Sequence, residues 1–285
     1  MTASYVTDLE LASALRWQLE IGVDTALLDT PLAQMPQPAR MSAGKQPAQD
    51  RAAGSADAFS SEAQAGGALS GDRQSGDHML NPPPASVTSD SDLSSVRTLE
   101  ELKQALAAFE GCALKKTASN LVFADGNPDA RVMIIGEAPG GDEDRMGLPF
   151  VGAAGQLLDK MLASVGLDRQ HVYITNILPW RPPGNRTPSS EEVAMLWPFL
   201  RRHIQLKAPQ VILALGGSSA KLILNTSTGI LKLRGQVQDI DFGEDGAPLL
   251  IPVLPSLHPA YLLRAPIMKR QAFADLLALR TLNRG

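Results

Sequence analysis

The sequence contains one cysteine, Cys112, among its 285 residues. A single thiol excludes an internal disulfide and any metal or cluster site that one chain would build from cysteines alone. The chain has no apolar run of about 18 residues or more, so no membrane span is expected. Its first residues, MTASYVTDLELASAL, lack a basic start followed by an apolar block. We therefore expect no secretory signal and a cytoplasmic protein.

The composition is otherwise ordinary for a soluble globular protein, with 44% apolar and 20% charged residues. The charge, however, is unevenly distributed. Residues 1–96 hold 5 Lys/Arg against 12 Asp/Glu, a net of −7, whereas residues 97–285 hold 21 against 18, a net of +3. This difference suggests two regions with different roles, and the second permits phosphate contacts without demanding them. Nothing in the sequence indicates more than a monomer.

Three regions follow one another along the chain. Residues 8–22 have an approximate apolar face and end in glycine, which predicts an amphipathic helix within an N-terminal region of residues 1–29. Residues 30–97 are rich in Ala, Ser, Pro and Gly and have no steady period, so we expect a disordered linker. A lone helix of this length is marginal in water, which favours its docking on the main domain of residues 98–285.

The main domain alternates predicted strands with predicted helices. The expected strands are 131–136, 172–176, 211–216 and 250–254, and the expected helices are 99–110, 156–165, 188–204, 218–224 and 269–282. Such alternation predicts a three-layer α/β/α fold with a mainly parallel central sheet. Ligands of such sheets bind at the carboxyl ends of the strands.

The first predicted strand leads into a glycine-rich, acidic loop, GEAPGGDEDRMGLPFVGAAG, over residues 136–155. The loop lacks dinucleotide and Walker spacing, because no Gly-Lys-Ser/Thr follows. Four acids within eight residues also make it a poor cradle for phosphates. The acidic residues fit a loop that activates water or holds a metal better than one that binds phosphate. The alternative is a polar turn without a catalytic or binding function.

Two further loops carry polar side chains at predicted strand ends. Asn176 ends the second strand and can read an amide edge, since its side chain both donates and accepts hydrogen bonds. A turn-forming asparagine is the commoner use. His258 follows the last strand and stands in the string PSLHPAYLLR. A lone histidine is more often structural, but its place at a strand end favours a site.

Together the three loops resemble family-4 uracil-DNA glycosylases. The strings GEAPGGDEDRMGLPFVGAAGQLL, YITNILPWRPPGNRTP and LPSLHPAYLLR occur in the family's order and at similar spacing, and the resemblance covers about residues 98–285. It implies the uracil-DNA glycosylase fold and a repair enzyme that flips uracil out of DNA and hydrolyses the N-glycosidic bond. Uracil-containing DNA is thus the implied partner.

The resemblance also implies roles for six residues. Phe150 would stack on the flipped base, and Asn176 would pair with the uracil edge and reject cytosine. His258 would donate a hydrogen bond to a uracil oxygen as negative charge grows on the ring. Glu137 and the backbone near Ala138 would hold the attacking water. Glu143 is a second candidate, which would support either the water or the loop geometry.

Four residues are implied to contact DNA. Leu262, Leu263 and Arg264 lie where the family inserts a wedge into the duplex, although a plain helix start explains the leucines almost as well. Arg186, in the loop that joins Trp180 to Pro188, is one of several basic residues that favour a polymeric substrate.

The sequence departs from the family at the iron–sulfur cluster. Family members usually hold a [4Fe–4S] cluster with four cysteines, and the aligned positions here are Phe109, Cys112, Trp180 and Leu196. One thiolate cannot hold such a cluster, so we expect no metal and no cofactor. We expect Phe109, Trp180 and Leu196 to pack instead as a small apolar plug.

Other functions are compatible with the same motifs. A non-catalytic or covalently trapping uracil-DNA-binding protein is one, although the trapping relatives use a loop histidine and the loop between Trp180 and Pro188 has none. A glycosylase for another deaminated base, an enzyme that acts on free nucleosides, and a scaffold that recruits partners through the linker are the others.

Overall fold

A computed structural model describes residues 93–244 and 246–283 of the chain. The helix predicted over residues 8–22 and most of the predicted linker lie outside these residues. The described part of the chain contains no helix that is both long and apolar enough to cross a membrane.

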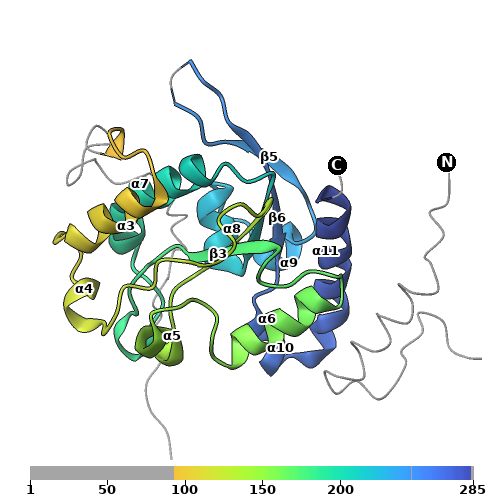
Figure 1. Ribbon diagram of the computed structural model, residues 1–285. Coiled ribbons are helices and arrows are strands. Elements are labelled where there is room, and N and C mark those ends of the chain that lie inside the picture. Colours follow the sequence, from red (N-terminus) through yellow and green to blue (C-terminus); the bar gives the residue numbers. More distant parts are fainter. Residues whose placement is uncertain (1–92, 245, 284–285) are drawn as a thin grey trace, which may run out of the picture. The chain divides into compact units, whose positions relative to one another are not determined.

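The centre of the fold is a six-stranded sheet (Figure 1). The strands lie in the order β1-β3-β2-β4-β6-β5, and the inner four are parallel. The two outer strands run antiparallel to their neighbours. The bounds are β1 Asp125–Gly126, β2 Val132–Gly136, β3 Val172–Asn176, β4 Val211–Leu215, β5 Gln238–Asp241 and β6 Leu250–Ser256. The predicted mainly parallel sheet is therefore confirmed, with two antiparallel edges added.

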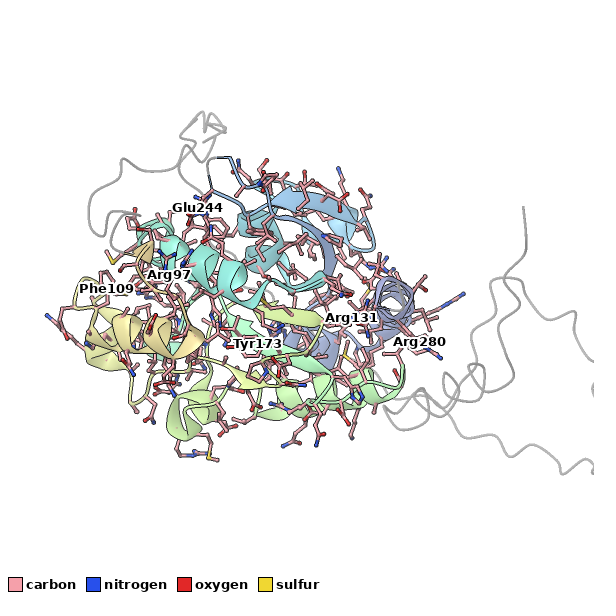
Figure 2. All side chains as sticks on the ribbon, turned by 45° about the horizontal axis from the view of Figure 1, so that its top comes forward. Arg97, Phe109, Arg131, Tyr173, Glu244 and Arg280 are labelled. Carbon is pink, nitrogen blue, oxygen red and sulfur yellow. The ribbon has the colours of Figure 1, made fainter. Side chains whose placement is uncertain are left out.

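Helices cover both faces of the sheet, which confirms the three-layer arrangement. The first face is covered by α3 Leu99–Ala108, α7 Ser190–Lys207, α8 Gly217–Ile223 and α9 Ile230–Leu233. The second is covered by α6 Ala153–Ala163, α10 Pro259–Arg264 and α11 Lys269–Leu282. The short helices α4 Leu114–Thr117 and α5 Gly141–Met146 and the 3-10 turns η1 Pro183–Asn185 and η2 Pro266–Met268 complete the chain. Figure 2 shows Phe109, beside α3, and Arg280, on α11, at opposite ends of the described domain.

The side chains of β2 point alternately to the two faces of the sheet, which explains why a helical layer forms on each face. Met133 and Ile135 pack into the apolar cluster beneath α3 and α7, whereas Val132 and Ile134 pack beneath α6 and α11. All four side chains are fully buried. A strand that is apolar on both faces needs a helix layer on each, because side chains of a strand alternate between the faces.

Two apolar residues just before the predicted boundary at residue 98 pack on the main domain. Leu93 and Val96 are buried in the same cluster as α3, and the guanidinium of Arg202 donates to the carbonyl of Val96 at 3.1 Å. The composition of residues 93–97 continues that of the linker, so the sequence gives no signal of this packing. Two buried apolar side chains and the Arg202 hydrogen bond attach these residues to the core.

A buried polar pair lies between β3 and α7. The hydroxyl of Tyr173 and Nε2 of His203 are 2.8 Å apart, and the ring of Phe123 stacks on His203 with centroids 4.5 Å apart. His203 is 4% exposed, and this burial lowers its pKa to about 3. The neutral imidazole is therefore the folded form at every ordinary pH.

Acid should destabilise the protein through this histidine. The unfolded chain takes up the proton near pH 6.5 and the folded chain near pH 3, so the stability held above pH 6.5 is lost as the pH falls toward 3. At pH 4.5 the loss is about 2–3 kcal/mol, at roughly 1.4 kcal/mol per pH unit. Urea unfolding at pH 7.5 and 4.5 should show a smaller loss for His203→Gln than for the wild type. Equal losses would contradict this assignment.

Candidate active site at the carboxyl ends of the strands

The three loops that carry the sequence motifs leave the same edge of the sheet. Glu137 directly follows β2, Asn176 ends β3, and His258 is the N-cap residue of α10, two residues after β6. β2 and β3 are adjacent parallel strands in which Gly136 lies opposite Asn176. The expectation that the motifs gather at the carboxyl ends of the strands is confirmed.

Gly136 allows Asn176 and Phe150 to approach each other. A Cβ at position 136 would lie 2.4 Å from Oδ1 of Asn176 and 2.6 Å from the ring of Phe150. Any larger residue would therefore displace one of the two side chains. Asn176 is 6% exposed, and within the described residues its amide makes no hydrogen bond. An amide whose donors and acceptor are unused by the protein is suited to an incoming polar edge.

Phe150 is held in an unusual backbone conformation. Its φ of 54° lies in the left-handed region, which costs a non-glycine residue about 1–3 kcal/mol and persists only where neighbours impose it. The neighbour here is Arg169, whose guanidinium donates to the carbonyls of Pro149 and Phe150. Arg169 is itself fixed by ion pairs with Asp125 and Asp159. Sequence reasoning missed Arg169, because no motif marks it and it lies 19 residues from Phe150.

Glu143 accepts hydrogen bonds from three backbone N–H groups of its own loop. One carboxylate oxygen accepts from the backbone N–H of Gly140 at 3.0 Å, as in a capping box for α5. The other accepts from the N–H groups of Val151 at 3.0 Å and Gly152 at 2.8 Å. Of the two expected roles, the contacts favour loop geometry, because Glu143 fixes the residues that directly follow Phe150.

His258 faces Phe150 and has a defined hydrogen-bonding state. Its ring stacks on that of Phe150 with centroids 5.5 Å apart. Its Nδ1 accepts from the backbone N–H of Ala260 at 3.1 Å, which caps α10. Burial lowers the pKa of His258 to about 4; the nearby Arg264 lowers it further and Glu143 opposes the shift. A neutral imidazole whose Nδ1 accepts carries its proton on Nε2, which is therefore the donor.

The carboxylate of Glu137 has one defined partner. Its Oε2 accepts from the hydroxyl of Ser218 at 2.8 Å, while its backbone carbonyl accepts from the N–H of Leu178 at 3.1 Å. Ala138, which follows, is half-buried and packs against the cluster beneath α3 and α7. Glu137 is half-buried as well, so its other oxygen can meet a water that enters the site.

The residues expected to contact DNA divide into two groups. Leu262 is fully buried against the α6–α11 layer, so it belongs to the core, and the expectation that it forms part of a wedge needs correction. Leu263 is 46% exposed and Arg264 is exposed. Arg186 is exposed but forms a two-point ion pair with Glu192, at 2.9 and 2.5 Å. Arg186 therefore shares its charge with a carboxylate on α7.

The positions aligned with cluster cysteines lie in the core. Phe109, Cys112, Trp180 and Leu196 are each no more than 9% exposed and belong to one apolar cluster, in which the rings of Phe109 and Phe199 are 5.1 Å apart. Burial raises the pKa of the Cys112 thiol, which disfavours the thiolate that a metal requires. In the described part of the chain, no group of three or more His, Cys, Asp or Glu side chains could hold a metal ion. The residues present do not fit an iron–sulfur cluster.

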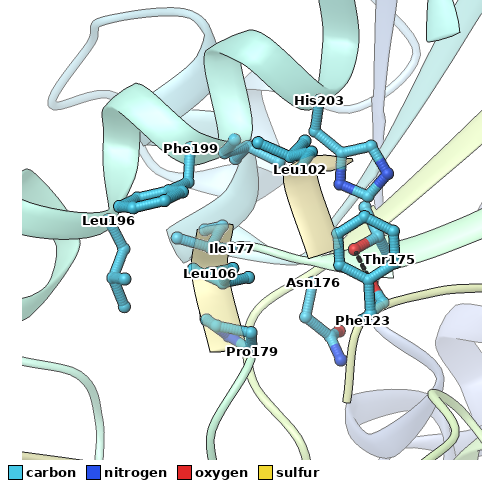
Figure 3. Close-up of a pocket in the computed structure, with 11 residues that line it drawn as sticks. Leu102, Leu106, Phe123, Thr175, Asn176, Ile177, Pro179, Leu196, Phe199 and His203 are labelled. Carbon is cyan, nitrogen blue, oxygen red and sulfur yellow. Dashed lines mark hydrogen bonds between the residues drawn. The ribbon is translucent and has the colours of Figure 1, made fainter. Parts of the chain in front are cut away.

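A small cavity lies among the side chains of this cluster and reaches Asn176 of the candidate site (Figure 3). Its volume of about 20 Å³ has room for about one water molecule. Figure 3 shows the side chain of Asn176 pointing away from Leu196 and Phe199. The lining is mostly apolar and comes from α3, α7, the end of β3 with the loop after it, and the segment before β1: Leu102, Leu106, Phe123, Thr175, Asn176, Ile177, Pro179, Leu196, Phe199, Leu200 and His203.

Comparisons with known proteins agree with this arrangement. Residues 123–278 match the model of the uracil DNA glycosylase superfamily. The chain is 39% identical over 185 residues to a type-4 uracil-DNA glycosylase of Archaeoglobus fulgidus, covering 63% of this chain and 90% of the relative. It is 37% identical over 190 residues to a type-4 uracil-DNA glycosylase of Sulfurisphaera tokodaii, covering 65% and 84%. A Thermotoga maritima enzyme of the same name is 38% identical over 167 residues, covering 58% and 83%.

Proposed function

We propose that this chain, which belongs to the uracil DNA glycosylase superfamily, removes uracil from DNA by hydrolysing the N-glycosidic bond. The observation that carries the proposal is the meeting of four groups at one edge of the sheet. These are the amide of Asn176, the ring of Phe150, the Nε2 donor of His258 and the carboxylate of Glu137. Together they supply a base pocket, a hydrogen-bond donor for the leaving group and a site for water.

Base recognition begins with a flipped nucleotide. A base inside a duplex cannot reach this edge of the sheet, so the nucleotide must leave the stack. Phe150 then stacks on the base, and the strained backbone that Arg169 holds fixes the position of its ring. The amide of Asn176 pairs with the polar edge of uracil and meets the wrong hydrogen-bond polarity in cytosine.

Bond cleavage places positive charge on the sugar and negative charge on the uracil ring. Nε2–H of His258 donates to a uracil oxygen as that charge develops, without a proton transfer. Glu137 and the backbone beside Ala138 hold the attacking water, and the carboxylate stabilises the cationic sugar. Exposed Leu263 and Arg264 contact the DNA from which the base has left.

The chemistry proceeds without an iron–sulfur cluster in this proposal. Support comes from the packed side chains themselves, because Phe109, Trp180 and Leu196 occupy the core where cluster ligands would stand. Their burial contributes stability of the kind that metal ligation would otherwise supply.

Cleavage of a labelled oligonucleotide with a single uracil, followed by alkali to break abasic sites, tests the function. The wild type should cut, and Glu137→Ala should lose most of the activity. Asp142→Ala is the matched control, since Asp142 lies in the same loop but pairs with Arg145 at the surface. Release of uracil from free deoxyuridine but not from the oligonucleotide would favour a nucleoside enzyme instead. Binding without cutting would favour a uracil-DNA-binding protein.

Asn176→Asp should weaken the distinction between uracil and cytosine. The change replaces the amide's donor with an acceptor, so uracil loses a hydrogen bond worth about 1–3 kcal/mol and the amino group of cytosine gains a partner. Single-turnover rates on matched uracil and cytosine oligonucleotides should give a smaller ratio than the wild type. Asn225→Asp, at an exposed position after α8, should leave the ratio unchanged. An unaltered ratio for Asn176→Asp would show that this side chain does not read the base.

A further inference from the structure

We infer that Ser218 is a positioning residue for Glu137, an inference that rests on the proposed function. The hydroxyl of Ser218 donates to Oε2 of Glu137 at 2.8 Å, although the two residues are 81 positions apart in the chain. They follow two adjacent parallel strands, because Glu137 comes directly after β2 and Ser218 lies in the first turn of α8, just after β4. The contact therefore joins the β4–α8 junction to the loop that carries the candidate catalytic acid.

The backbone around Ser218 is fixed at two points. Gly216, the residue before α8, has a φ of 93°, and a Cβ there would lie 3.1 Å from Cβ of His258. The neighbouring Ser219 is fully buried and donates to the carbonyl of Ile135 on β2 at 2.8 Å. The first turn of α8 is thus held against Ile135 of β2, two residues before Glu137. This contact restricts where the hydroxyl of Ser218 can lie relative to Glu137.

The carboxylate of Glu137 depends on this one contact for its orientation. In the described part of the chain it forms no ion pair, and the Ser218 hydroxyl is its one hydrogen-bond donor. A carboxylate that keeps one oxygen on a fixed donor presents the other in a defined direction. Ser218 therefore aims the second oxygen of Glu137 at the position of the attacking water, and the serine itself does not contact substrate.

Loss of this bond should slow the reaction without weakening DNA binding. Ser218→Ala should lower the single-turnover rate on a uracil oligonucleotide by roughly 10- to 100-fold, because small misplacements of a reacting group carry penalties of that order. Ser218→Thr keeps the hydroxyl and should restore most of the rate. Thermal unfolding of both variants should stay close to that of the wild type, because the bond lies at a half-buried position.

A double-mutant cycle separates positioning from a structural role. In a Glu137→Ala background, Ser218→Ala should change neither the residual rate nor the affinity for the uracil oligonucleotide, measured by fluorescence anisotropy, by more than about twofold. Ser219→Ala is the matched control: it removes a buried bond to the backbone of β2, so its effect should persist in that background.

The outcomes distinguish this inference from the function on which it rests. A wild type that cuts uracil oligonucleotides while Ser218→Ala cuts equally fast overturns the role of Ser218 alone. That role is also overturned if Ser218→Ala slows cutting equally in the Glu137→Ala background, or if Ser218→Thr is as slow as Ser218→Ala. A folded wild type that does not cut overturns the proposed function, and the role of Ser218 with it.

Discussion

Replacement of His258 by alanine should lower the single-turnover rate of uracil release by about 10²–10³, the effect expected when one preorganised donor to a developing anion is removed. The geometry gives the reason. Nδ1 of His258 accepts from the N–H of Ala260, so the neutral ring carries its proton on Nε2, on the side free to donate. Alanine removes the donor and leaves the growing charge of the uracil ring without a partner.

The pH dependence of the same reaction tests the protonation state. Burial lowers the pKa of His258 to about 4, so the ring is neutral above that value and titrates only as the pH falls toward 4. The factor between wild type and His258→Ala should thus stay constant from about pH 5.5 to 8. His171→Ala, at an exposed histidine that pairs with Asp168, should leave the rate unchanged. A factor that changes with a midpoint near 6.5 would indicate that the charged ring acts instead.

The parts of the site that sequence predicts are those that follow strands. Glu137, Asn176 and His258 each stand where a buried apolar run ends, and parallel strands bring such positions to one edge. Arg169 and Ser218 make contacts between segments that are separate in the sequence, and neither lies in a recognisable pattern. A hydroxyl or guanidinium can position another residue only when the fold brings the two together. Sequence patterns therefore give little indication of such a role.

The errors in prediction have similar causes. Two adjacent leucines at a helix cannot both face solvent when one side of that helix packs on the core, and α10 buries Leu262 while it exposes Leu263. The edge strand β5 escapes prediction because its sequence, QDID, is polar and largely exposed. β1 is two residues long and has no periodicity to detect. Core strands, by contrast, are apolar on both faces, and sequence places them within two residues of their ends.

Leu196→Ala should destabilise the protein by about 2–5 kcal/mol, the range for truncating a buried leucine that leaves a cavity. Leu196 is 1% exposed, lies beside Phe199 on the wall of an existing cavity and belongs to the cluster that contains Phe109 and Trp180. Because Leu196 already borders a cavity, fewer side chains lie close enough to move into the space that its truncation leaves. Urea unfolding at pH 7.5 measures the loss, and Leu231→Ala, at a 59% exposed leucine on α9, should change stability by less than about 0.5 kcal/mol.

This substitution also tests how the domain stabilises the region where related proteins are expected to hold a cluster. If buried apolar side chains stabilise this region in place of a metal cluster, Leu196→Ala should strongly lower the free energy of unfolding. The rate of uracil release, measured well below the melting temperature, should stay within a few-fold of the wild type. Purified wild-type protein should then contain no stoichiometric iron, and chelators should not alter its unfolding. Stoichiometric iron, or a loss below about 1 kcal/mol for Leu196→Ala, would show that packing of this side chain is not what stabilises the region.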